Sequence, residues 1–410
     1  MELIYSSIKE FEDTYKKNQG LYNTQCSCSA YFEMHLENTN VSIGECEIQI
    51  NECPVMVCEK CGKKHLCPDI PREICAAYFE MVKNGQSLCK LTIKANIRYE
   101  YAEKADFIYD SRDMCIPGIG VDLDPTRLEG FSCPVFFKRN VLNNFFTDDD
   151  YELDFFSESY GAIAKKATDG SQYEWEIVFG INKNNKVVLF LGDLDQIKPD
   201  DPAIYWLKSY NEKSDHCIVD TELFRAQMNC MFSEPIIEKR IISLRNAFFK
   251  KMKEKYDVDL FHLEEEIEEK GDDLQKPINY SKREVKENII TLDGVLNEGI
   301  DCGKLRKLCM KIVDHIPKDI KELKTRKLLQ AIIAEKSGED AARKIVAPLF
   351  YLNDLRVCFA HLIPQKEIDE YEANIVLAFG LSDFTEYKKM YDTLIDELYS
   401  LYRYLNVTEI

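Results

Sequence analysis

A run of apolar residues near the C-terminal end, from Leu349 to Ile363, constrains the fold of this chain more than any other stretch. It reads LFYLNDLRVCFAHLI, and Asp354 and Arg356 are its only formally charged residues. A helix that is apolar on all sides is typical of a protein core or an interface. Charge in such a place costs free energy unless it is paired or used. The run therefore predicts a core or interface helix in which Arg356 and His361 have a paired or a functional role.

Size and charge set the broad class of the protein. The 410 residues are enough for two or three domains. The formal net charge is −19, so contact with nucleic acid would require a local basic patch. The N-terminal residues, MELIYSSIKEFEDTYKK, predict a polar amphipathic helix rather than a signal peptide, and no apolar run is long enough to cross a bilayer. We expect a cytoplasmic, multidomain protein that does not bind membranes.

Cysteine is concentrated in the N-terminal third, which holds eleven of the sixteen. In a long chain without a signal peptide, this pattern indicates metal binding or free thiols rather than disulfides. Cys26 and Cys28 form a Cys-x-Cys pair, and Cys58 and Cys61 form a Cys-x-x-Cys pair followed by Gly62. Two tight turns of this kind can each present two sulfur atoms to one tetrahedral zinc ion.

Two β-rich segments, residues 30–36 and 45–50, separate the cysteine pairs, so the sequence predicts a small β module around zinc. The zinc would be structural, because four thiolates leave no open position for a substrate. Cys53, His65 and Cys67 are alternative ligands, and the sequence does not choose between the two sets.

The stretch ECPVMVCEKCGKKHL resembles the zinc-ribbon module of the YgiT/MqsA-type antitoxins, in which an apolar strand leads into a Cys-x-x-Cys-Gly knuckle. The resemblance covers residues 24–70 and implies a structural zinc ion. The first knuckle here is Cys-x-Cys, where the family has Cys-x-x-Cys. No helix-turn-helix pattern is evident, so the DNA binding of those antitoxins is not predicted.

Residues 91–234 predict an α+β domain, after an N-terminal domain of residues 1–90 that ends in a helix over 70–85. The alternating stretch LTIKANIRYEY, residues 91–101, predicts a strand. Two β-rich runs flank the polar turn 182–185 and predict a hairpin. The second run, KVVLFL, is continuously apolar, which is typical of a buried central strand.

From residue 235 to the end, the apolar period becomes 3.6 residues, which predicts an all-α bundle with short connections. The expected helices span residues 236–256, 259–270, 281–296, 304–315, 318–336, 338–363, 366–378 and 383–405. One stretch of this acidic chain is basic. Lys304, Arg306, Lys307 and Lys311 begin it, and they are candidate contacts for an RNA phosphate backbone.

Arg356 and His361 are five positions apart, which is about 140° around a straight helix. They converge only if the helix ends before Pro364 or if a symmetry mate supplies the second set. This Arg-x4-His pattern in an all-α domain resembles the HEPN family. The resemblance implies a metal-independent endoribonuclease that acts as a homodimer with composite sites.

The resemblance implies that His361 transfers the proton of the ribose 2′-hydroxyl and that Arg356 stabilises charge on the phosphoryl oxygens. Asp354 and Asn353 would orient them. The first functional hypothesis is thus an RNA-cleaving effector of a bacterial toxin or antiphage system, with tRNA a possible target. The other domains would respond to a phage trigger or a regulatory partner. The alternative is a non-catalytic regulatory or interaction protein with a zinc ribbon and a helical dimerisation domain.

Overall fold

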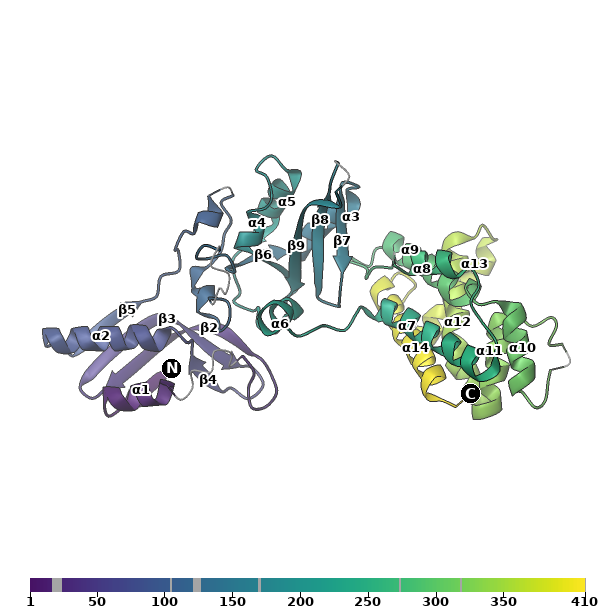
Figure 1. The fold of residues 1–410 in the computed structure, drawn as a ribbon, viewed down its shortest axis with the longest axis horizontal. Coiled ribbons are helices and arrows are strands. Elements are labelled where there is room, and N and C mark those ends of the chain that lie inside the picture. The colour runs from purple at the N-terminus through teal and green to yellow at the C-terminus, as the bar shows by residue number, and fades with distance from the viewer. Residues whose placement is uncertain are drawn as a thin grey trace. The chain divides into compact units, whose positions relative to one another are not determined.

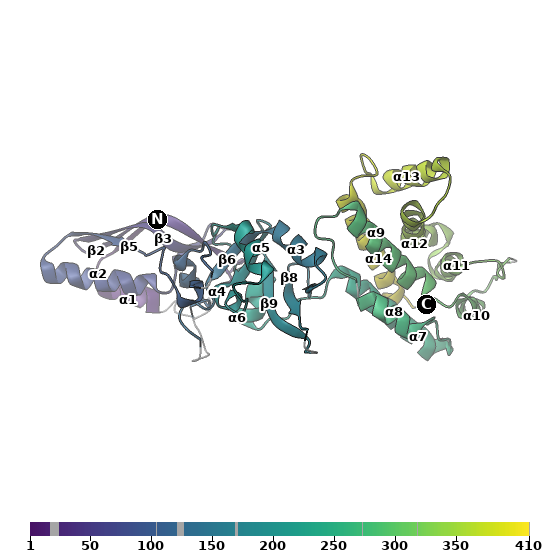
Figure 2. The ribbon, with the colours of Figure 1, turned by 90° about the horizontal axis from the view of Figure 1, so that it is seen from above.

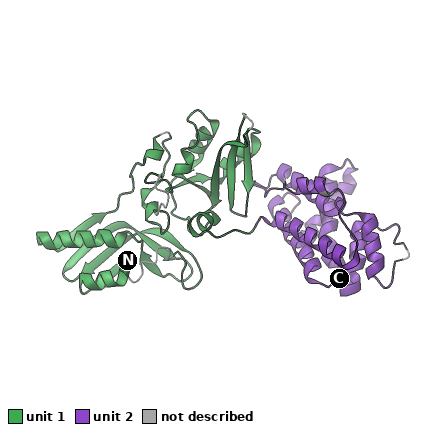
Figure 3. Cartoon of the chain, viewed as in Figure 1, with its two compact units in different colours: residues 1–234 green, residues 235–410 purple. Residues whose placement is uncertain are grey.

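The computed structural model describes residues 1–16, 24–103, 105–120, 127–168, 171–272, 274–317 and 319–409. The N-terminal and central regions are built on two β-sheets, and the C-terminal region is helical (Figure 1). The chain divides into two compact units, residues 1–234 and 235–410 (Figure 3). This layout agrees with the predicted order of β-rich, mixed and helical regions, whereas a domain boundary at residue 90 stays a prediction.

The first sheet is built on the long antiparallel hairpin of β2 and β3. β1 pairs with β2 in parallel, and β3 pairs on its other side with β4 and, farther along, with β5. Its strands are β1 (Glu2–Tyr5), β2 (Phe32–Ile43), β3 (Cys46–Cys58), β4 (Lys64–Leu66) and β5 (Leu88–Thr92). The helices α1 (Ile8–Lys16) and α2 (Ile70–Asn84) lie on one face of this sheet (Figure 2).

Two local predictions for this region are wrong and one is confirmed. Residues 2–5 are not helical, because they extend along β2 and form β1. Of the predicted strand 91–101, only Leu91 and Thr92 are in a strand, and β5 belongs to the first sheet rather than to the central one. The helix α2 ends as predicted, since Gly85 adopts a φ of 65° that favours glycine.

The second sheet has the strand order β11-β6-β10-β9-β8-β7, and all neighbouring pairs are antiparallel. Its strands are β6 (Pro134–Lys138), β7 (Tyr151–Phe155), β8 (Tyr160–Lys166), β9 (Tyr173–Ile181), β10 (Lys186–Phe190) and β11 (Asn211–Glu212). β9 and β10 form the predicted hairpin. β10 lies between β6 and β9 with residues 187–190 buried, which explains its continuous apolar run.

Short helices cover and connect this second sheet. They are η1 (Glu100–Ala102), η2 (Ser111–Cys115), η3 (Arg139–Val141), α3 (Leu142–Thr147), α4 (Leu191–Leu194), α5 (Pro202–Tyr210) and α6 (Glu222–Asn229). Buried side chains from both sheets belong to one apolar cluster. The carboxylate of Glu33 on β2 adds a polar link, because it accepts bonds from the N–H groups of Val219 and Asp220 at 3.1 Å each.

Asp201 organises one end of the second sheet. Its carboxylate caps α5 through the Ala203 N–H at 3.0 Å and accepts bonds from Tyr151 (2.5 Å), Lys165 (2.9 Å) and Trp175 (3.1 Å). Burial alone would raise the pKa of Asp201, but these donors outweigh it and hold that pKa below its ordinary value. A carboxyl group of this kind stabilises the fold above pH ~4, and the contribution is lost as the pH falls further.

Asp201→Asn is therefore expected to destabilise the first unit by about 3 kcal/mol at pH 7 and by less near pH 3. Urea unfolding followed by tryptophan fluorescence measures this directly, since both tryptophans of the chain, Trp175 and Trp206, lie in this unit. The exposed neighbour Asp200 provides the control Asp200→Asn. An equal loss in both variants, or a loss that is the same at both pH values, would contradict the expectation.

The second unit contains all eight predicted helices, with shifted ends. They are α7 (Ile237–Tyr256), α8 (Glu264–Asp272), α9 (Lys282–Asp293), α10 (Cys302–Ile312), α11 (Thr325–Ser337), α12 (Glu339–Ala360), α13 (Gln365–Phe379) and α14 (Tyr387–Val407). Ser281 and Glu284 form the capping box of α9. The predicted helix 281–296 is interrupted, because α9 passes into a π-helical turn, η4 (Gly294–Glu298).

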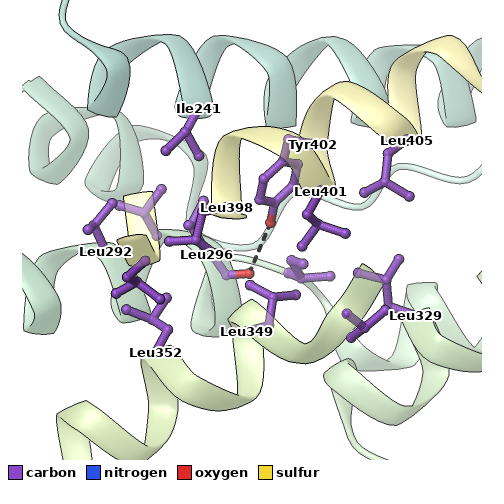
Figure 4. Packing of buried hydrophobic residues seen from close by; sticks show 14 of the residues in the cluster. Ile241, Leu292, Leu296, Leu329, Leu349, Leu352, Leu398, Leu401, Tyr402 and Leu405 are labelled. Atoms are coloured by element: carbon purple, nitrogen blue, oxygen red, sulfur yellow. Dashed lines mark hydrogen bonds between the residues drawn. The ribbon is translucent and has the colours of Figure 1, made fainter. Parts of the chain in front are cut away.

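Residues 349–360 of the apolar run lie in α12, which packs against α9, α11, α13 and α14. Figure 4 shows Leu349 and Leu352 of α12 in a cluster with Leu296, Leu329 and Tyr402. The Tyr402 hydroxyl donates to the carbonyl oxygen of Leu296 at 3.5 Å. The prediction of a core helix is confirmed, and its charged residues Asp354 and Arg356 are partly buried.

Candidate functional site

The β2–β3 hairpin brings the two predicted cysteine knuckles together. Its register places Phe32 opposite Cys58, so the residues before β2 and those after β3 meet at one end of the hairpin. In the first knuckle, the Cys26 N–H donates to the Ala30 carbonyl at 2.7 Å. The Ser29 N–H donates to the Cys26 carbonyl at 2.8 Å, with Ser29 at a φ of 68°. A single intervening residue, Ser27, thus still gives a closed turn.

The second knuckle is closed by two backbone bonds. The Gly62 N–H donates to the Cys58 carbonyl at 2.8 Å, and the Cys58 N–H donates to the Lys63 carbonyl at 2.9 Å. Gly62 has a φ of 72°, a conformation that glycine adopts without strain, as the sequence predicts.

The four sulfur atoms of the knuckles form one compact group. The sulfurs of Cys26 and Cys61 are 3.5 Å apart, as are those of Cys28 and Cys58, and all four lie within 4.8 Å of one another. A tetrahedral ion with Zn–S bonds of ~2.3 Å requires sulfur separations of ~3.8 Å. The group could therefore hold one metal ion without a change of fold.

Backbone amides favour the metal-binding form of two of these thiols. The N–H of Cys28 donates to the Cys26 sulfur and lowers the pKa of Cys26 to about 6. The N–H of Cys61 in the same way lowers the pKa of Cys58 below its ordinary value. The Lys63 N–H lowers the pKa of Cys61, but contacts with the neighbouring sulfurs outweigh it and raise that pKa to about 11. The backbone amides therefore favour the metal-binding thiolate at Cys26 and Cys58.

The alternative ligands predicted from the sequence lie outside this group. Burial raises the pKa of Cys53 to about 11 and also raises that of Cys67, as expected for apolar, uncoordinated thiols. The Nδ1 atom of His65 lies 3.1 Å from the carbonyl oxygen of Leu66. The structure thus brings together Cys26, Cys28, Cys58 and Cys61 and excludes Cys53, His65 and Cys67 from the same centre.

The second knuckle also contacts the central sheet. Glu59, between the two cysteines, pairs with Lys183 of the β9–β10 turn at 2.5 Å and lies 3.6 Å from the Nε2 atom of His35. The cysteine centre is therefore connected to both sheets of the first unit.

In the second unit, Arg356 lies in a charged pocket at the π-helical turn. Its Nη1 is 3.3 Å from Asp293 Oδ2, and its Nη2 is 2.9 Å from Glu298 Oε1. The Asp293 side chain is only 2 % exposed, whereas that of Arg356 is 30 % exposed. Burial raises the pKa of Asp293, and the Asn297 amide and the Arg356 charge oppose this rise.

His361 and Asp354 are placed differently from Arg356. His361 is the first residue after α12 and is exposed, and within the described residues no hydrogen bond joins its ring to the Arg356 guanidinium, whose partners are Asp293 and Glu298. Asp354 is half-buried, its Oδ1 is 3.4 Å from the Asn353 amide, and burial raises its pKa. The predicted break of the helix before Pro364 is present, but it exposes His361 rather than turning it inward.

A cleft of about 820 Å³ opens beside Arg356. Its lining residues are His262, Asp293, Asn297, Glu298, Ile300, Asp301, Cys302, Gly303, Lys324, Thr325, Arg326, Asn353 and Arg356. Among these, Arg356 and Asn353 were predicted as site residues, and Lys324 and Arg326 belong to the predicted basic stretch, residues 304–327. The others come from loops and helix ends far apart in the chain and carry no comparable signal in the sequence.

The four predicted RNA contacts do not line this cleft. Three of them donate to backbone carbonyl oxygens of their own unit: Lys304 to Phe261 (3.3 Å), Arg306 to Ile320 (2.9 Å) and Leu323 (3.0 Å), and Lys311 to Tyr256 (2.5 Å). Lys307 is exposed. The bonds of Lys304, Arg306 and Lys311 link α10 to neighbouring segments of the unit. The contact of all four side chains with RNA stays a prediction.

Comparisons with protein-family models, with curated proteins and with solved structures gave no match. Within the described ranges, no helix combines the length and the apolar character that a bilayer crossing requires.

Proposed function

We propose that the protein is a metal-independent endoribonuclease effector of the HEPN type, of the kind used in bacterial toxin or antiphage systems. The observation that carries the proposal is the end of α12, where a partly exposed Arg356 faces a cleft and an exposed His361 follows the helix. Because one chain does not bring the two side chains together, the proposed site is composite and forms in a homodimer.

In this proposal, a neutral imidazole of His361 accepts the proton of a ribose 2′-hydroxyl near neutral pH. The guanidinium of Arg356 binds the phosphoryl oxygens, on which negative charge develops. Asp293 and Glu298, which line the same cleft, hold the guanidinium in place. Asp354, as predicted from the sequence, would orient the pair.

The cysteine centre has a structural role in the proposal, as in the zinc ribbons that it resembles. A single zinc ion bound by the four thiolates would stabilise the first sheet, and no substrate position would remain on it. The two sheets of the first unit would then form the region that senses a trigger or binds a regulatory partner in the cytoplasm.

A second candidate function is supported by the ion pairs of Arg356. Two carboxylates already neutralise this guanidinium, which is also the arrangement of a purely structural charge cluster. The helical unit would then be a dimerisation or interaction module without catalysis.

Arg356→Ala and His361→Ala are each expected to reduce RNA cleavage at least about 100-fold, because each removes a group that acts in the transition state. The assay incubates wild type and variants with tRNA and with total RNA in buffer without divalent cations, and light scattering reports the oligomeric state. Arg343→Ala and His315→Ala alter exposed residues of the same types in the same unit and serve as controls. Wild-type cleavage in both test variants, with unchanged folding, would leave only the non-catalytic function.

A further inference from the structure

The loop between β11 and α6 is attached to η2 by a histidine and a buried carboxylate. The Nδ1 atom of His216 lies 2.6 Å from Oδ1 of Asp113, a bond that spans 103 positions of the chain. The Asp113 side chain is fully buried, and that of His216 is 14 % exposed. Because a buried carboxylate without a partner costs free energy, this bond stabilises both groups and holds the loop in place.

The backbone around His216 forms a closed turn. His216 has a φ of 62°, a left-handed conformation that a residue other than glycine keeps only when its surroundings hold it there. Its N–H donates to the Ser214 hydroxyl at 2.9 Å, and this hydroxyl lies 3.3 Å from the Nδ1 atom of the same histidine. The Cys217 N–H donates to Asp215 Oδ1 at 3.2 Å. The turn thus presents the imidazole to Asp113.

The other charged groups on the η2 side already have partners. Arg112 pairs with Asp110 at 2.6 Å and with Glu52 at 2.7 Å. The Arg112 charge is therefore largely balanced, and Asp110 adds a smaller attraction for a positive imidazole. Asp113 is thus the main charge that His216 meets on η2.

On the loop itself, the neighbouring carboxylate is directed elsewhere. Asp215 accepts a bond from the Asn182 amide at 3.0 Å and lies 3.7 Å from Lys186 Nζ. This second attachment joins the loop to the β9–β10 turn. It leaves the bond to Asp113 as the contact of the loop that changes with the protonation of His216.

Three thiols also surround the Asp113 carboxylate, and they stay neutral. Burial raises the pKa of Cys115 to about 12 and raises those of Cys67 and Cys133 well above their ordinary value, and the Asp113 charge adds to each rise. They therefore contribute no charge that changes near neutral pH.

The pair of Asp113 and His216 loses a proton as the pH rises. Burial lowers the pKa of His216, but the bond and the charge of Asp113 outweigh burial and raise that pKa above its ordinary value. Burial raises the pKa of Asp113, and the bond and the charge of His216 oppose this rise. A histidine whose pKa is raised on folding gives stability that is complete below its unfolded pKa, about 6.5, and is lost as the pH rises through its folded pKa.

We propose that residues 213–217 are a pH-sensitive latch of the first unit, closed while the pair of His216 and Asp113 holds its proton and opened when that proton is lost. The next residues, Ile218 and Val219, are fully buried in the apolar cluster that both sheets share. Opening the latch would loosen the connection of the second sheet to α6. The latch goes beyond the proposed nuclease and does not depend on it, because it lies in the first unit.

The test follows hydrogen exchange of the amides of residues 213–217 in the full chain, as protection relative to the unfolded rate, from pH 6 to pH 9. We expect protection to fall about fivefold over this range, because the bond loses one of its two charges. In His216→Gln, the amide can still donate to Asp113 but takes up no proton, so protection should not depend on pH. His315→Gln alters an exposed histidine of the second unit and should keep the wild-type profile.

A second carboxylate close to the loop is separated from the latch by the choice of amides. Glu33 accepts the N–H groups of Val219 and Asp220, and burial raises its pKa to about 7. Its titration acts on those two amides, whereas the latch acts on residues 213–217. Glu33→Gln should therefore leave the pH dependence of residues 213–217 unchanged. If this variant abolishes the pH dependence, the response belongs to Glu33 and the proposal is wrong.

Titration of the imidazole itself gives a readout that a purely structural contact would not move. In carbon-13 NMR of labelled histidine rings, the resonance absent from His216→Gln should titrate above about pH 6.5 in the wild type and at lower pH in Asp113→Asn. The wild-type exchange profile needs no variant, so the test stands even if Asp113→Asn fails to fold. Protection of residues 213–217 that is constant from pH 6 to pH 9, or a wild-type His216 that titrates below about pH 6.5, would overturn the proposal.

Discussion

Replacing Cys58 by serine is expected to abolish metal binding by the cysteine group and to unfold the hairpin end of the first sheet. Cys58 is fully buried, is the last residue of β3, and has its sulfur 3.5 Å from that of Cys28. Apparent binding free energies of structural zinc are about 10–16 kcal/mol, which is comparable to the entire stability of a domain. Loss of one thiolate would also leave three sulfurs crowded together without a cation between them.

Elemental analysis should find about one zinc ion per wild-type chain and almost none in Cys58→Ser. Hydrogen exchange should show fast exchange of the amides between Thr24 and Leu66 in the variant. Cys46→Ser is the matched control, because Cys46 lies in the same hairpin but outside the cysteine group. A wild-type protein that contains no zinc and still protects these amides would contradict the assignment.

Gly299→Ala is expected to destabilise the second unit by about 3 kcal/mol. A Cβ at this position would lie 2.5 Å from the Val295 carbonyl oxygen and 2.7 Å from Arg245 Nη2. Neither group can move easily, since the carbonyl is backbone and Arg245 is 1 % exposed and donates to the Gly299 carbonyl at 2.6 Å. The substitution would therefore deform the π-helical turn that carries Asn297 and Glu298.

Urea unfolding, with hydrogen exchange of α7, α9 and α10 to locate the change, measures the effect. Gly294→Ala is a close control, because it lies in the same turn and its Cβ would meet only the Lys270 Nζ atom at 3.8 Å. We expect this control to be neutral or slightly stabilising, since alanine favours helix over glycine. Equal stability of the two variants would show that the turn can relax around a side chain.

Local patterns predicted much of this fold because their information lies within a few residues. The 3.6-residue period gave the eight helices of the second unit, and the polar turn between two β-rich runs gave the β9–β10 hairpin. The Cys-x-x-Cys-Gly motif predicted the tight turn that residues 58–62 form. The choice of Cys26 and Cys28 over Cys53 and Cys67 was not local, because it depends on the register that sets Phe32 opposite Cys58.

The cleft could not be predicted from the sequence for the same reason. Its walls come from a helix that passes into a π-helical turn, from the start of α11 and from the end of α12. The turn itself depends on Arg245 of α7, a contact over 54 positions. Likewise, the basic stretch predicted a positively charged surface. It did not predict that Arg306 donates hydrogen bonds to the carbonyl oxygens of Ile320 and Leu323.

The ion pair between Glu59 and Lys183 links the second cysteine knuckle to the β9–β10 turn of the second sheet. Glu59 keeps its position only while the turn between Cys58 and Cys61 keeps its shape. A change in that turn, such as oxidation of its thiols, would therefore displace Glu59 and weaken its ion pair with Lys183 of the β9–β10 turn. The cysteine group and the second sheet share this one exposed contact, so the chemical state of the thiols would be felt at the turn, while the strands on either side keep their backbone pairing.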